Sequence, residues 1–142
     1  MPMVQTFQGF ILFILVGVLL CGCFGSGDDI DRVVVSGTVT YNGEPIADGQ
    51  IRFVPNYGSK LPISGGPITD GNYTIKMRGG VPVGTHRIEI NSFRKLEKRY
   101  PDQPEEMVPK EQLLPPKFNE ESELEREVPA GRLLTLDFPL SD

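Results

Sequence analysis

His86 is the only histidine of the chain and the first residue to consider for chemistry, because imidazole exchanges protons near neutral pH. It shares its parity with Ile88 and Ile90, while the two charged residues between them point the opposite way. This alternation predicts a strand with His86 turned inward. A hydrogen-bonded histidine in the core or at its rim therefore fits better than a catalytic base, and a small hydrolase or metal-dependent enzyme centred on His86 is the alternative.

Other reactive residue types form no recognisable site. The serines considered as nucleophiles lie in no nucleophile motif; they are Ser36, Ser64 and Ser92. Carboxylates that could bind calcium do not have the spacing of a defined calcium loop; they are Asp28, Asp29, Asp31 and, with loop carbonyls, Asp70. We therefore expect no catalytic residue, no metal and no cofactor.

Three aromatic residues are candidates for a surface that binds a glycan or a peptide: Tyr57, Phe93 and Tyr100. The chain has no tryptophan, so the signal for a carbohydrate-binding module is weak, and scattered surface aromatics are ordinary. A basic cluster between Arg94 and Arg99 predicts a solvated loop, or a weak contact with anionic lipid or an acidic partner.

Charge and composition restrict the class of protein. The 142 residues include 13 prolines and 16 glycines, which disfavours a helical protein and favours one small β-domain. All charged side chains lie at or after Asp28, and the net charge is -5. No basic stripe interleaved with aromatics is present to neutralise phosphates, so we expect no binding to nucleic acid.

The beginning of the chain predicts an export signal. Phe10 to Leu20 is an uninterrupted apolar run, shorter than the roughly 20 residues that a membrane-spanning helix needs. The following segment, Leu20-Cys21-Gly22-Cys23, resembles the lipobox of bacterial lipoproteins, in which the last cysteine receives diacylglycerol and becomes the mature N-terminus. The segment departs from the usual lipoprotein signal in two ways. Met1 to Gln8 contain no Lys or Arg, and position 21 is a cysteine.

The lipobox resemblance implies three segments. Residues 1–22 would be a cleaved signal peptide, residues 23–32 a lipidated N-terminus with a flexible tether, and residues 33–142 a β-domain. Two acyl chains on Cys23 give stable anchoring where one gives only marginal binding. The protein would then sit in a bacterial cell envelope, in the periplasm or on the outer surface. An ordinary cleaved signal and an uncleaved anchor are the alternatives.

Strand-like alternation organises the rest of the chain. Val33–Pro55 predicts a strand, an Asn42-Gly43 turn and a second strand that resumes at Gln50. Further strands are predicted around Tyr73–Met77, behind an Asp-Gly turn, and around His86–Ile90. Gly and Pro punctuate 56–67, which predicts a loop there.

The C-terminal third is less regular. Residues 93–116 are charged and contain five prolines after Tyr100, which predicts a loop without helix or central strand. Leu124 and Val128 fit a helix or a strand equally well. A turn at Pro129-Ala130-Gly131 then precedes a last strand with four apolar residues on one face: Leu134, Leu136, Phe138 and Leu140.

The spacing of these strand residues resembles the carboxypeptidase regulatory-like domain, a transthyretin-like (prealbumin-like) fold. The matching positions are Val35-x-Gly37-x-Val39-x-Tyr41-x-Gly43-x-Pro45, Gly49-x-Ile51-x-Phe53-x-Pro55, Thr69-Asp70-Gly71-x-Tyr73-x-Ile75 and Gly84-Thr85-His86-x-Ile88-x-Ile90. A later run is similar to the ending of small bacterial lipoproteins that carry this module alone; it comprises Leu114-Pro115-Pro116-Lys117-Phe118-Asn119, Ser122, Leu124, Val128 and Phe138-x-Leu140. The resemblance covers about Val33 to Leu140. His86 stands where the family usually has tyrosine.

The resemblance implies an antiparallel β-sandwich of about seven Greek-key strands without reactive residues of its own. One histidine cannot supply the His, Glu and His ligands of a zinc carboxypeptidase. The function implied is a membrane-anchored, non-catalytic binding, assembly or scaffold module. Its partners would be the membrane, through Cys23, and an envelope protein or glycan.

Overall fold

The computed structural model of the protein describes residues 30–142. The predicted signal peptide 1–22, the acyl acceptor Cys23 and residues 24–29 of the predicted tether lie outside the described residues. Among residues 30–142, no helix has the length and apolarity needed to cross a membrane.

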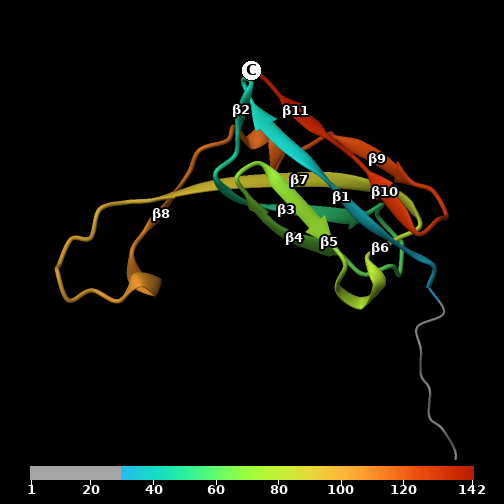
Figure 1. Cartoon of the computed structure of the whole chain (residues 1–142), viewed down its shortest axis with the longest axis horizontal. Coiled ribbons are helices and arrows are strands. Elements are labelled where there is room, and N and C mark those ends of the chain that lie inside the picture. The colour runs from blue at the N-terminus through green and yellow to red at the C-terminus, as the bar shows by residue number, and fades with distance from the viewer. Residues whose placement is uncertain (1–29) are drawn as a thin grey trace, which may run out of the picture.

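The described residues form an all-β domain of eleven strands with no α-helix among them (Figure 1). The strands are β1 (Arg32–Tyr41), β2 (Glu44–Pro45), β3 (Asp48–Pro55), β4 (Ser64–Thr69), β5 (Asn72–Ile75), β6 (Val81–Pro82), β7 (Gly84–Lys95), β8 (Lys110–Gln112), β9 (Glu125–Val128), β10 (Leu133–Thr135) and β11 (Phe138–Leu140). Three single-turn 3-10 helices complete the chain: η1 (Met77–Gly79), η2 (Glu105–Met107) and η3 (Pro116–Phe118).

Seven strands form the main path of the sheet, in the order β10-β1-β5-β4-β3-β7-β8. β9 pairs with β7, and β2, β6 and β11 pair with β1. The sheet curls, so that Phe53 of β3 meets Phe138 of β11 edge-on across the interior, with 6.5 Å between ring centroids. This all-β, curled and largely antiparallel sheet is consistent with the predicted sandwich.

β1 confirms the predicted first strand, but its partner differs from the expected one. Asn42 and Gly43 have φ of 50° and 87°, the positive values that a tight turn requires, yet the returning strand β2 is only two residues long. The carbonyl of Ile46 then accepts the N–H of Gly71 at 2.7 Å, which leads the chain away from β1. β3 therefore pairs with β4 and β7, and β5 pairs with β1.

β4 occupies part of the predicted loop 56–67, so that prediction was wrong from Ser64 onward. Gly65 permits the close approach to β3, because a Cβ at this position would lie 2.5 Å from the carbonyl oxygen of Ile51. β5 pairs only with Ile68 and Thr69, so the rest of β4 has one neighbour. A strand with a free side tolerates proline, which explains Pro67.

The C-terminal strand prediction also needs correction. Two short strands, β10 and β11, replace the single strand, and both run parallel to β1 rather than antiparallel. The chain bends between them at Leu136 and Asp137, where it passes directly against Gly37. Asp137 accepts hydrogen bonds there from the backbone N–H and hydroxyl of Thr38, at 2.8 and 2.9 Å. The bend keeps Phe138 and Leu140 buried.

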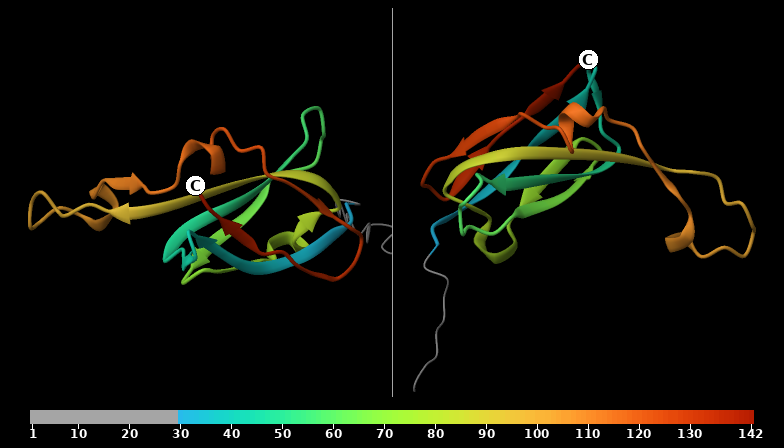
Figure 2. Two further views of the ribbon diagram at one scale, coloured as in Figure 1. Left: turned by 90° about the horizontal axis from the view of Figure 1, so that it is seen from above. Right: turned by 180° about the vertical axis from the view of Figure 1, so that it is seen from behind.

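Residues 93–116, expected to be a loop, contain the end of β7, β8 and the helix η2. Phe93 to Lys95 pair with Lys110 to Gln112 as a hairpin that projects beyond the sheet (Figures 1 and 2). We call residues 93–114 the arm. β8 lies at an edge, where charged residues and nearby prolines are tolerated. Between Leu124 and Val128 the chain is a strand, β9, which resolves the ambiguity of the sequence.

Candidate binding site

His86 is fully buried in β7, as its parity predicts. Its ring packs edge-on against Phe53, and its Nδ1 lies 3.0 Å from the carbonyl oxygen of Gly84. Nε2 is buried without a hydrogen-bond partner. Burial lowers the pKa of His86 below its ordinary value, an effect that the Gly84 carbonyl partly offsets. The ring therefore acts as a neutral aromatic side chain of the core.

The other candidate reactive groups stay apart. The side chains of Ser64 and Ser92 donate to the carbonyls of Gly80 and Asp48, so both hydroxyls have structural partners. Within residues 30–142, no group of three or more His, Cys, Asp and Glu side chains lies close enough together to hold a metal ion. The calcium candidates Asp28 and Asp29 lie outside the described residues.

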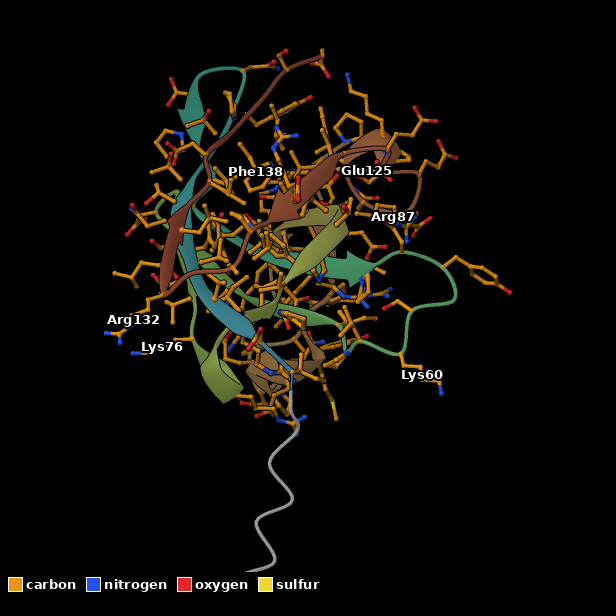
Figure 3. The ribbon with its side chains drawn as sticks, turned by 90° about the vertical axis from the view of Figure 1, so that its right-hand side faces the viewer. Lys60, Lys76, Arg87, Glu125, Arg132 and Phe138 are labelled. Atoms are coloured by element: carbon orange, nitrogen blue, oxygen red, sulfur yellow. The ribbon has the colours of Figure 1, made fainter. Side chains whose placement is uncertain are left out.

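The three predicted surface aromatics do not form one patch. Tyr57 is fully exposed in the loop after β3 and lines a cleft together with Arg87 and Glu125. Figure 3 shows Arg87 and Glu125 on the same side of the domain. β3 ends at Pro55, which pairs with His86, whereas Phe93 lies seven residues further along β7, about 23 Å of extended strand away. Tyr100 is exposed in the arm. A glycan surface made of all three residues is therefore not assembled.

An open apolar groove lies at the base of the arm. Its volume is about 370 Å³, and it is lined by the β1–β2 turn region, the β2–β3 connection, the end of β7 and the segment after β8; the residues are Tyr41, Glu44, Pro45, Ile46, Ala47, Asp48, Ser92, Phe93, Arg94, Leu113 and Leu114. Ile46 and Leu114 are buried and continue into the core, while Leu113 is 44% exposed. The groove thus presents apolar side chains to solvent above the buried core.

Hydrogen bonds from Gln112 hold one wall of this groove. Its Oε1 accepts from the backbone N–H of Ser92 at 2.9 Å and of Leu114 at 3.2 Å, and its Nε2 donates to Asn91 at 2.7 Å. The N–H of Leu113 donates to the carbonyl of Ser92 at 2.8 Å. The arm is therefore fastened to β7 on the side of the groove.

Beyond the groove, the arm carries three more exposed apolar side chains: Leu96, Tyr100 and Met107. Three of the four side chains of its basic cluster form ion pairs, and the fourth, Arg99, lies over the ring of Tyr100. Lys98 and Lys95 contact Glu105 at 2.9 and 3.0 Å, and these contacts hold the pKa of Glu105 below its usual value. Arg94 pairs with Glu111. The arm therefore displays apolar side chains between ion pairs, which is typical of the rim of a protein interface.

Most groove residues escaped the sequence analysis. Phe93 was singled out as an aromatic, but its partners Ile46 and Leu113 come from segments 67 residues apart in sequence. The adjacent Leu113-Leu114 pair inside a polar, proline-rich stretch was the one available signal. Long-range pairing of the arm base with the β2–β3 connection is what assembles the site.

No family model, no curated protein and no solved structure matches the chain.

Proposed function

We propose that the protein is an exported bacterial lipoprotein whose β-domain is a non-catalytic binding, assembly or scaffold module. Acyl chains on Cys23 anchor it to a membrane of the cell envelope, facing the periplasm or the outer surface. The β-domain is of the carboxypeptidase regulatory-like, transthyretin-like kind. The lipobox-like segment and the strand motifs support this proposal, together with the curled all-β sheet.

The observation that carries the binding role is the apolar groove beside the arm. Grooves that combine exposed apolar side chains with fixed polar rims suit an apolar segment of a partner protein. The N–H of Leu113 donates to the carbonyl of Ser92, and the hydroxyl of Ser92 donates to the carbonyl of Asp48 on the opposite wall. These bonds hold the groove in place before a partner arrives. The partner is thus an envelope protein rather than a substrate, and a glycan is the alternative.

The geometry of His86 favours binding over the alternative of a small hydrolase. A general base needs access to its substrate and, in the common triads, a carboxylate that orients it. The His86 side chain has no exposed surface, and the carbonyl of Gly84 is the one hydrogen-bonding neighbour of its ring in the described residues.

A displayed-peptide library tests the groove. We expect the full-length protein in detergent to enrich apolar peptides, and Leu113→Glu to weaken their binding at least about tenfold, the equivalent of roughly 1.4 kcal/mol. Leu96→Glu is the matched control, because Leu96 is 43% exposed and lies outside the groove. Peptides that bind both variants equally would show that the groove is not the binding site. Glycan-array binding that is insensitive to Leu113→Glu would favour the carbohydrate-binding alternative.

The anchor is tested separately in living cells. An inhibitor of the lipoprotein signal peptidase should shift the protein from its mature to its precursor form. If the ratio of the two forms stays unchanged, Cys23 is not the site of lipid-dependent processing.

A further inference from the structure

Four cationic side chains of the domain have no partner in the described part of the chain: Lys60, Lys76, Arg78 and Arg132. Every other lysine and arginine makes an ion pair, a hydrogen bond or a contact with an aromatic ring. Because the chain has a net charge of -5, it contains enough carboxylates to pair with every cation. The common location of these four cations therefore calls for an explanation.

All four cations lie around the beginning of β1, where the chain enters the domain. Figure 3 shows Lys76 and Arg132 on one side of this entry point and Lys60 on the other. Arg78 lines two clefts together with Arg32, the first residue of β1. Among residues 30–142, no carboxylate lines either cleft. We call this end of the domain the entry face.

The entry face also exposes large apolar side chains. Met77 is 78% exposed, Leu133 is 79% exposed and Ile63 is 52% exposed. Ile63 and Met77 line the same cleft of about 220 Å³, next to Arg32 and Arg78. Leu133 pairs with Val34 in β1 and follows Arg132 directly. Lys76, Arg78 and Arg132 therefore flank these exposed apolar side chains. This combination matches the chemistry of a lipid interface, where apolar side chains enter the headgroup layer and cations meet phosphates.

We propose that the entry face of the domain lies on an anionic lipid surface. The inference rests on the proposed acylation of Cys23, because the seven residues from Phe24 to Ile30 span only about 13–16 Å by random-coil scaling. Such a tether keeps the entry face within contact distance of the bilayer. Asp28, Asp29 and Asp31 oppose the attraction, so the contact needs the high local concentration that the anchor provides.

The position of the arm fits this orientation. The arm lies away from the end where the chain enters the domain (Figures 1 and 2), and the groove lies at its base. Three arm cations, Arg94, Lys95 and Lys98, are already paired with carboxylates, while Arg99 and Lys110 contact aromatic rings. With the entry face on lipid, the groove remains accessible to an envelope partner. The two exposed apolar surfaces of the domain thus have different occupants.

The absence of tryptophan makes a direct test possible. The full-length protein with Met77→Trp, reconstituted into vesicles with brominated acyl chains, reports contact through fluorescence quenching. We expect strong quenching on phosphatidylcholine vesicles that contain about 30% phosphatidylglycerol, and its loss at about 1 M salt, where the Debye length is about 3 Å. Met107→Trp in the arm is the matched control, 68% exposed, and should not be quenched.

Charge variants complete the test. In the Met77→Trp background, Lys60→Gln, Lys76→Gln, Arg78→Gln and Arg132→Gln together should abolish quenching, since each charge contributes about fivefold to the partition. Replacement of four arm cations by glutamine, at Arg94, Lys95, Lys98 and Lys110, should leave the quenching intact. Quenching that is equal on vesicles without phosphatidylglycerol, or equal for Met107→Trp, would overturn the proposal. So would no quenching at all, the result expected if the entry face binds an acidic protein.

The intact mass of the same preparation separates the two proposals. A mass without acyl chains refutes the anchor. Acylated protein whose Met77→Trp reporter is not quenched refutes the lipid-bound entry face and leaves the anchor in place.

Discussion

His86 gives the stability of the domain a predictable dependence on pH. Its pKa is lowered by burial in the folded state, whereas in the unfolded chain it stays near 6.5. The unfolded state therefore binds the proton more readily, so the stabilising contribution of neutral His86 is complete above about pH 6.5 and declines as the pH falls below it.

Replacement of this histidine tests that dependence. His86→Phe keeps the aromatic contact with Phe53 and removes both the titration and the unpaired Nε2. We expect the loss of stability between pH 7 and pH 5, measured by urea unfolding, to be smaller in the variant than in the natural protein. An unchanged or larger pH dependence would mean that other groups control it. His86→Tyr, the residue of the resembled family, should also fold.

Gly37 is required by the bend between β10 and β11. A Cβ at this position would lie 1.9 Å from the carbonyl oxygen of Leu136, so the C-terminal segment would have to move away from β1. We expect Gly37→Ala to lower the free energy of unfolding by about 3 kcal/mol or more. The matched control is Gly131→Ala, where nothing lies within 4 Å of the added methyl group. Equal thermal stability of the two variants would contradict the close approach.

At the scale of elements, β10 and β11 are integral to the core. Phe138 and Leu140 are buried, and Phe138 contacts the rings of Phe53 and Tyr73. Truncation after Gly131 should therefore leave a chain without a cooperative thermal transition. A soluble truncated protein that still melts cooperatively would show that β1 does not need these strands.

The outer part of the arm, by contrast, should be dispensable for folding. Lys95 and Lys110 are directly paired, so a two-residue Asn-Gly turn can replace residues 96–109 without changing the register. We expect the shortened protein to keep its stability within about 1 kcal/mol and to retain the groove, whose lining residues all lie outside the deleted segment. Loss of the folded state would assign the arm a structural role instead.

The elements that sequence patterns predicted well are those whose two faces differ. Alternation identified β1, β3, β5 and β7, including the inward position of His86. It failed for β4, whose glycines and proline resemble a loop, because close approach to β3 overrides local propensity. It also missed the parallel pairing of β10 and β11, since periodicity carries no information about a strand's neighbour. The groove depends on the same long-range pairing.

At the scale of the whole molecule, two ends of the domain carry different surfaces. One end gathers the cations that lack a partner in residues 30–142, and the arm with its groove points elsewhere (Figure 1). Such a layout suits a module that stands on one surface and meets a partner with another. Only the anchor itself rests on residues outside the described part, so it is the claim that most needs measurement.

The intact mass of the protein extracted from bacterial membranes tests that claim most directly. We expect the mass of Cys23 to Asp142 plus two or three acyl chains. A mass that retains Met1, or a soluble product without acyl chains, would contradict the lipid anchor.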